Sequence, residues 1–220
     1  MKRLLWLVPL LLFLPSLVLN VIFLRRNREL QSNNRVATVI DGDTFTLKSG
    51  QRIRLCNLYA PELEYCGGKE AKKKLEDLIL GKEIEIQIAS HDQYNRPLGL
   101  VYVGKTLVNE VLLKEGWARY DGTPNPKREV LKAAYDYAVS NKKGIFSSLC
   151  ISEKPERPNC LIKGNIQRSD GSKTYHFPGC SEYAAVIVEK DLGEKWFCSE
   201  EEAQKAGFAK AKNCFGKKYK

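Results

Sequence analysis

The sequence predicts an α+β protein in which a five-stranded β-barrel of the OB type carries three helices. A transmembrane helix is expected before the barrel, and a small module containing cysteine and histidine is expected after it. Three observations support this organisation: an uncharged apolar run at residues 4–24, alternating strand and helix patterns within residues 34–150, and four cysteines and one histidine beyond that point. We therefore divide the chain into an anchor with its linker (1–33), a barrel domain (34–150) and a C-terminal module (151–220).

The apolar run at residues 4–24 has the length of a membrane span. At about 1.5 Å of helical rise per residue it covers about 30 Å, the thickness of a bilayer's hydrocarbon core. The end of this run with its basic flank, VLNVIFLRR (residues 18–26), lacks the small-residue pair at which a signal peptide is usually cleaved. We expect an uncleaved anchor, with a cleaved signal peptide and secretion as the alternative. Because basic residues flank both ends, the positive-inside rule leaves the orientation open.

The barrel domain is predicted from the order of its elements. Strand patterns and helix patterns alternate along it, and glycine or proline marks most of the boundaries. Strands are expected at 35–40, 43–48, 51–59, 82–90 and 97–103, and helices at 69–81, at 106–116 with Thr106 as its cap, and at 126–144. Three strands, a helix, two strands and two helices is the order of a small barrel that closes on itself and so exposes no sheet edge.

Charge and cysteine content restrict the partners and the compartment. The formal net charge is +10 at pH 7, and the last sixteen residues alone contain six lysines. A basic chain favours polyanionic partners, either nucleic acid or anionic lipid headgroups, although a merely solvated lysine-rich surface is the ordinary alternative. Seven cysteines in 220 residues indicate a location outside the reducing compartment or a metal site.

Four polar residues of the barrel domain form a pattern suited to phosphodiester chemistry. Such chemistry needs a carboxylate to accept a proton from water, cationic donors for the transition state, and often a metal ion. Glu62 follows a strand end, Arg54 lies on that strand, Arg96 lies in a later turn, and Asp43 lies at the first strand junction. Each residue alone has an ordinary explanation as a turn or surface residue, so the prediction depends on their combination.

The barrel domain resembles the staphylococcal nuclease family, the thermonuclease-like domains. The resemblance covers about residues 34–150, and its motifs are VIDGDTFTL, RIRL followed by APE, GKEAKKKLEDLILGKEIEI, DQYNRPLGLVYVGKTLVNEVLLKEGWA and AYDYAVSNKKGIFS. The resemblance implies an OB barrel with three helices and an endonuclease that hydrolyses DNA or RNA, preferring single strands. The alternative is a non-catalytic nucleic-acid-binding domain of the same fold.

The resemblance also implies roles for individual residues. Arg54 and Arg96 match the two arginines that clamp the phosphate, and Glu62 matches the glutamate proposed as general base. Asp43 matches an aspartate that binds calcium, and Tyr94 matches a tyrosine that packs against the bound nucleotide. A planar guanidinium fits the oxygens of a phosphate better than a lysine ammonium does.

One position departs from the family pattern. The family usually has an aspartate two residues before the proline, as a second calcium ligand, whereas this chain has Tyr59 in LYAPE. Calcium requires several oxygen ligands, so we expect Ca²⁺ to bind weakly here. Asp41, the carbonyl of Ala60, and Glu62 through a water molecule are the groups that could compensate.

The cysteines of the C-terminal module have two main alternative interpretations, with free thiols as a third. His176, Cys180, Cys198 and Cys214 have the composition of a tetrahedral Zn²⁺ site, and the pattern faintly resembles the zinc module of Ada-type DNA-repair proteins. An oxidising location would instead favour disulfides among Cys150, Cys160, Cys180, Cys198 and Cys214.

The remaining two cysteines lie in the barrel domain. Cys56 is predicted to be a buried strand residue, and Cys66 to lie in a loop. Taken together, the sequence predicts a membrane-anchored, extracytoplasmic nuclease.

Overall fold

The computed structural model describes residues 16, 18–23 and 34–219. Residues 18–23 are helical, but most of the predicted anchor at residues 4–24 lies outside the described part of the chain. Among the residues that are described, no helix combines the length and the apolar character needed to cross a membrane. The anchor therefore stays a prediction.

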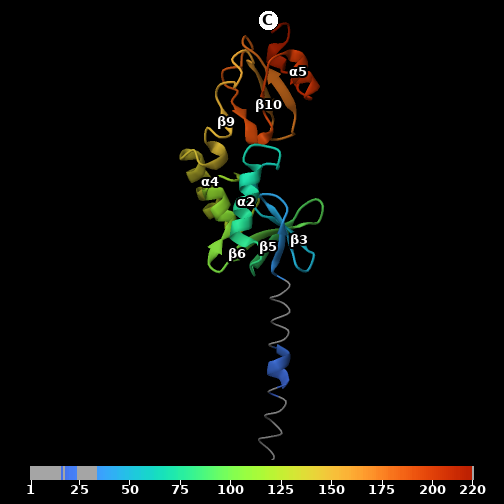
Figure 1. Ribbon diagram of the computed structural model, residues 1–220, viewed down its shortest axis with the longest axis vertical. Helices are drawn as coiled ribbons and strands as arrows, with labels where there is room; N and C mark the ends of the chain where they lie inside the picture. Colours follow the sequence, from blue (N-terminus) through green and yellow to red (C-terminus); the bar gives the residue numbers. More distant parts are fainter. Residues whose placement is uncertain (1–15, 17, 24–33, 220) are drawn as a thin grey trace, which may run out of the picture.

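The barrel domain contains a strongly curved sheet (Figure 1). Its strands follow the order β1-β2-β3-β6-β5, with β7 added beside β6. The first three strands form an antiparallel meander, β3 then pairs in parallel with β6, and β6 pairs antiparallel with β5. The strands are β1 (Val36–Val39), β2 (Thr44–Leu47), β3 (Arg52–Leu55), β5 (Glu85–His91), β6 (Pro97–Val103) and β7 (Thr106–Leu107).

Hydrogen bonds between the start of β1 and the segment before β5 close this sheet. The Val36 amide donates to the Lys82 carbonyl at 3.0 Å, and the Ile84 amide donates to the Asn34 carbonyl at 3.3 Å. The two ends of the strand order are thus joined, which is the closure that the predicted barrel requires. Alternating apolar side chains of β2 and β3 are buried, namely Phe45, Leu47, Ile53 and Leu55, and on β6 the consecutive Leu100 and Val101 are buried as well.

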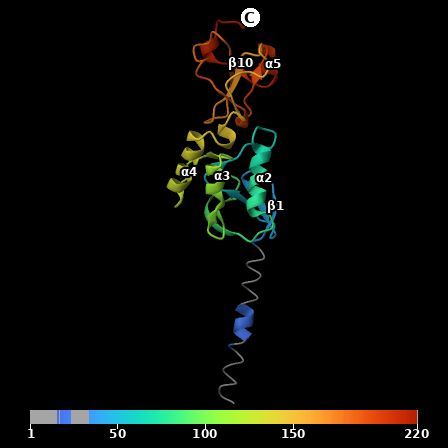
Figure 2. The ribbon, with the colours of Figure 1, turned by 60° about the vertical axis from the view of Figure 1, so that its left-hand side comes forward.

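Three helices cover one side of the barrel, as Figure 2 shows. They are α2 (Gly68–Ile79), α3 (Val108–Lys114) and α4 (Arg128–Ser140), and α3 packs between the other two. In α2, the fully buried Ala71, Leu75 and Ile79 recur every four residues, so one stripe of the helix faces the barrel. The predicted helix at 69–81 is confirmed; it starts one residue earlier and ends two residues earlier than expected.

Two local predictions were wrong. The strand expected at 51–59 is interrupted after Leu55, where Asn57 has a positive φ of 61°; the buried Cys56 therefore lies in a turn, and the chain resumes as β4 (Leu58–Tyr59), which pairs with β8 (Arg119–Tyr120). Thr106 is not a helix cap. It pairs with Val103 in a short hairpin, and α3 starts after Leu107 without a side-chain cap.

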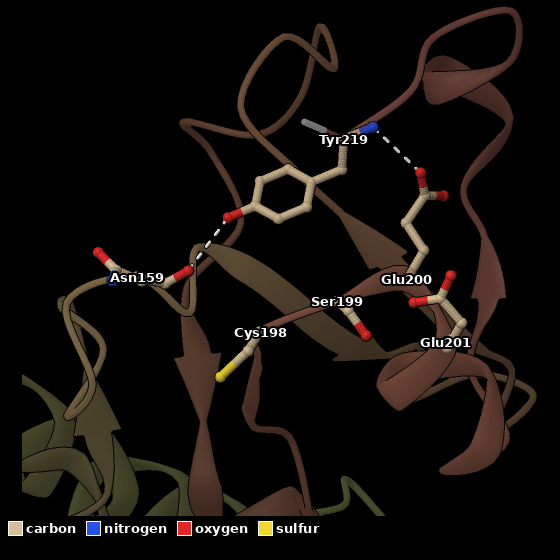
Figure 3. A pocket seen from close by; sticks show the side chains of 6 residues that line it. All are labelled: Asn159, Cys198, Ser199, Glu200, Glu201 and Tyr219. Carbon is tan, nitrogen blue, oxygen red and sulfur yellow. Dashed lines mark hydrogen bonds between the residues drawn. The ribbon is translucent and has the colours of Figure 1, made fainter.

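The C-terminal module is built on a second sheet of order β13-β10-β11-β14. Its strands are β10 (Ile162–Ile166), β11 (Lys173–His176), β13 (Trp196–Phe197) and β14 (Ala209–Lys210), and a short helix, α5 (Glu200–Lys205), follows β13. The tail returns to this sheet: the Tyr219 hydroxyl donates to the Asn159 carbonyl and its amide donates to Glu200 (Figure 3). The module thus has a core of its own, formed largely by Ile162, Tyr175, Phe177, Phe197 and Phe208.

Three disulfides replace the predicted zinc site. They join Cys66 to Cys150, Cys160 to Cys198, and Cys180 to Cys214. The zinc alternative is wrong because all three of its cysteines are consumed in these bonds and offer no thiolate. The disulfide alternative is confirmed with one correction: Cys66 does lie in a loop, but it is bonded to Cys150.

The barrel domain and the C-terminal module are joined at a tightly connected junction. Near the Cys66–Cys150 disulfide, β9 (Ile151–Ser152) pairs with β12 (Val188–Glu189), which leads into the short helix η2 (Lys190–Leu192). Arg119 of β8 donates to both carboxylate oxygens of Asp191 at 2.7 and 3.0 Å, and both side chains are buried. The buried ion pair between Arg119 and Asp191 therefore connects the barrel domain to the module, and the Lys190 amide, which donates to the Cys150 carbonyl at 2.9 Å, adds a backbone contact between them.

Candidate active site

The two predicted phosphate-binding arginines face one cavity. β3 pairs in parallel with β6, and Arg54 lies opposite Leu98, two residues after Arg96. This register brings both arginines to the same edge of the barrel although 42 positions separate them in the sequence. They line a cavity of about 340 Å³ together with Leu55, Asp92, Gln93, Tyr94, Leu98 and Asp121.

A buried carboxylate holds Arg54. Its Nη2 donates to Oδ2 of Asp43 at 2.8 Å, and the Ala60 amide donates to the same oxygen at 3.1 Å. The Thr44 hydroxyl donates to Oδ1 of Asp43 at 2.7 Å. Burial raises the pKa of Asp43 to about 6, although the positive charge of Arg54 opposes this rise. At neutral pH the carboxylate is therefore ionised and holds the guanidinium in place.

A second carboxylate, Asp92, holds Arg96. Arg96 donates from Nε to Oδ2 of Asp92 at 2.6 Å and from its backbone amide to Oδ1 at 2.9 Å. Partial desolvation raises the pKa of Asp92, but the hydrogen bonds from Arg96 and from the Tyr94 amide hold it below its ordinary value. Asp92 was not among the predicted site residues. Its position at the start of a turn, four residues before the arginine, was the available signal.

Tyr94 stands at the open side of this cavity. Its side chain is 72% exposed, and its ring centroid lies 5.4 Å from Cζ of Arg96. An exposed aromatic ring beside an arginine offers a surface on which a base can stack.

Glu62 lies apart from the cavity lining. Its side chain is exposed, and its negative charge, second to burial, raises the pKa of Tyr59. The backbone of Glu62 packs closely against the start of α2. A Cβ on Gly68 would come within 2.0 Å of the Glu62 carbonyl oxygen, so only glycine at position 68 allows this close approach. The structure thus brings Arg54, Arg96 and Tyr94 together around the cavity, with Asp43 bound to Arg54, and it leaves Glu62 outside the cavity lining, near Tyr59.

The residues present do not fit the calcium ion that the resemblance implies. Calcium takes six to eight oxygen ligands, whereas the Asp43 carboxylate already accepts hydrogen bonds from Arg54, Thr44 and Ala60. Tyr59, where the family has a second carboxylate, is neutral and lies with its ring 5.9 Å from Cζ of Arg54. Within the described ranges, no cluster of three or more histidine, cysteine, aspartate or glutamate side chains is arranged to hold a metal.

Comparisons with known proteins agree with the geometry. The family model described as "Staphylococcal nuclease homologue" matches residues 52–148. An "Uncharacterized endonuclease" of Haemophilus influenzae is 33% identical over 111 residues, which are 49% of this chain and 62% of that protein. A "Micrococcal nuclease" of Shigella flexneri is 34% identical over 104 residues, 40% of this chain and 60% of that protein.

An "Uncharacterized endonuclease" of Escherichia coli O157:H7 is 31% identical over 121 residues, which are 52% of this chain and 77% of that protein. The chain thus spans less than two thirds of the Haemophilus and Shigella relatives and more than two thirds of this one. The matched region carries the strands, the turn and the helices that build the cavity. The chain belongs to the staphylococcal nuclease family.

Proposed function

We propose that this protein is an endonuclease that hydrolyses phosphodiester bonds in DNA or RNA. The observation that carries the proposal is the cavity in which Arg54 and Arg96 face one space, each held by its own carboxylate. Fixed cationic donors stabilise a transition state better than mobile ones, because they need no reorganisation when charge develops. The descriptions of the relatives as endonucleases support the same reaction.

In this proposal the scissile phosphate occupies the cavity between the two arginines. Each guanidinium donates hydrogen bonds to non-bridging phosphate oxygens, and their charges offset the negative charge that grows on these oxygens in the transition state. A water molecule attacks the phosphorus in line, and Glu62 accepts its proton. The phosphorus–oxygen ester bond then breaks, and the leaving oxygen takes a proton from solvent. No step is assigned to a metal ion.

Single-stranded substrates are expected. Tyr94 can stack on a base only if that base is free of its partner strand, since a paired base has its faces covered by neighbouring pairs. The exposure of this ring leaves room for such a base beside the phosphate.

An extracytoplasmic location fits the three disulfides, because such bonds persist in oxidising compartments. We further propose that residues 4–24 anchor the protein in the membrane. After a high-salt wash the protein should stay in the membrane fraction, and intact mass should show a chain starting at or near Met1. A start between residues 25 and 34 would instead establish a cleaved signal peptide.

Cleavage of a single-stranded oligonucleotide tests the activity itself. The wild-type protein should cleave it, and Arg54→Ala should remove most of the activity. Arg52→Ala is the matched control, because Arg52 lies on the same strand but is exposed and does not line the cavity. Binding of the oligonucleotide without any cleavage would favour the non-catalytic nucleic-acid-binding alternative.

A further inference from the structure

A second and larger cavity adjoins the proposed active site. It has a volume of about 580 Å³ and lies between the barrel domain and the C-terminal module. Arg54 and Asp121 line both cavities, so the two spaces meet at the arginine that is proposed to bind the scissile phosphate. The volume falls in the range of pockets that enclose a molecule of nucleotide size.

The two walls of this cavity come from different parts of the chain. The barrel domain contributes Arg54, Tyr59, Arg119, Tyr120 and Asp121. The C-terminal module contributes η2 through Leu192 and the turn between β10 and β11 through Ile166, Gln167, Arg168 and Gly171. The combination of tyrosine rings with arginines is that of a groove that stacks bases and follows a charged backbone.

The wall formed by the module is fixed in shape. In the β10–β11 turn the Gln167 amide donates to the Ser172 carbonyl, the Gly171 amide donates to the Gln167 carbonyl, and the Ser172 amide donates to the Asp170 carboxylate. Gly171 has a positive φ of 71°, a conformation in which glycine meets no steric penalty. The turn therefore presents its side chains in one arrangement.

Arg168 is held in the same way as the two arginines of the active site. Its Nη2 donates to Oε2 of Glu189 at 2.6 Å, and its side chain is 52% exposed. Glu189 also contacts Arg119 at 3.2 Å, and Arg119 is anchored in the junction by Asp191. Arg168 is thus connected to the barrel domain through a continuous chain of ion pairs that runs by way of Glu189 to Arg119.

We propose that this cavity binds the part of a single-stranded nucleic acid that flanks the scissile phosphate, with Arg168 contacting a neighbouring phosphate and Tyr59 contacting a base. The proposal rests on the proposed nuclease function and adds a role for the C-terminal module, which lies outside the region matched by the family model. Tyr59 supports it, because its ring is 42% exposed and faces this cavity, where a base could stack on it.

The test compares a long and a short substrate with the full-length protein. A dinucleotide has one phosphodiester, so no second phosphate is left for Arg168 when that phosphate lies between Arg54 and Arg96, whereas a 12-nucleotide single strand has further phosphates. Arg168→Ala should lower kcat/KM for the 12-mer about tenfold, the loss expected for one charge-assisted hydrogen bond. The loss should appear in KM and should be less than about twofold for the dinucleotide.

Arg157→Ala serves as the matched control. Arg157 lies in the same module and also pairs with a carboxylate, Glu202, but it lines neither cavity. It should leave kcat/KM for both substrates unchanged. Arg168→Lys, which keeps the charge, should recover part of the loss, and melting temperatures should show that all three variants fold.

Two results would overturn the proposal: equal kinetics of Arg168→Ala and the wild type on the 12-mer, or an equal loss on both substrates. If the wild type cleaves neither substrate, the nuclease function fails, and the cavity is then tested by fluorescence anisotropy of the labelled 12-mer. Weaker binding by Arg168→Ala than by Arg157→Ala would support the cavity as a strand-binding site. Equal binding by the two variants would refute it.

Discussion

Replacing Arg119 by methionine should lower the free energy of unfolding by about 3–5 kcal/mol, the usual cost of leaving one partner of a buried ion pair unpaired. The side chains of Arg119 and Asp191 are 8% and 1% exposed, and two hydrogen bonds join them. Without the guanidinium, the Asp191 carboxylate keeps its burial but loses its partner. Burial already raises the pKa of Asp191, so the variant should bind a proton there at a higher pH than the wild type does.

Urea unfolding at pH 7 measures this cost, provided that the dependence of the unfolding free energy on urea is unchanged. The double variant Arg119→Met, Asp191→Leu is the decisive companion, because it removes the charge together with its partner. Replacing both members of a buried pair with apolar groups is often nearly neutral. The double variant should therefore be more stable than Arg119→Met alone, with a coupling energy of about 2 kcal/mol or more.

A loss below about 1 kcal/mol for Arg119→Met would refute the reasoning, because it would place the pair in an environment as well hydrated as a surface salt bridge. Additive effects in the double variant would refute it as well. Either result would also weaken the view that the Arg119–Asp191 pair holds together the two walls of the large cavity, one from the barrel domain and one from the C-terminal module.

Three further predictions concern the proposed active site. Arg96→Lys should lower kcat about 100-fold, about 3 kcal/mol, since lysine keeps the charge but lacks the planar fork; near-normal turnover would remove Arg96 from the mechanism. Because the residues present do not fit calcium, calorimetry should show at best about millimolar binding by the wild type, whereas Tyr59→Asp adds a carboxylate and should bind calcium more tightly; an unchanged affinity in a folded variant would place residue 59 outside any calcium site. The cleavage rate should fall below about pH 6 as Asp43 takes up a proton and releases its arginine, and Asp43→Asn should lack this step in its pH profile.

Local patterns predicted most elements of the barrel domain because its helices and strands bury regularly spaced residues. The four-residue spacing of Ala71, Leu75 and Ile79 is enough to indicate α2. Thr106 shows the limit of such reasoning. Its residue type suits a helix cap, but Gly104 turns the chain back on β6, and this pairing takes the threonine into a strand.

Contacts between distant residues were not predictable in this way. Arg119 and Asp191 are 72 positions apart and belong to no shared motif. Cys66 and Cys150 are 84 positions apart, and the same cysteines that form disulfides also have the composition of a zinc site. Asp92 was overlooked for another reason: aspartate is common in turns, and only the geometry shows that it also holds Arg96.

The arrangement of Asp43, Arg54 and Tyr59 can be explained as one unit. The carboxylate of Asp43 neutralises part of the Arg54 charge, which weakens the attraction for phosphate but fixes the direction of the guanidinium. A second carboxylate at position 59 would face the bound phosphate without a cation of its own, and the repulsion between them would oppose substrate binding. A tyrosine avoids this repulsion and adds a stacking surface to the larger cavity, beside the Arg54 that lines both cavities. The departure from the family motif is therefore what we expect of a site that relies on fixed arginines and extends toward the C-terminal module.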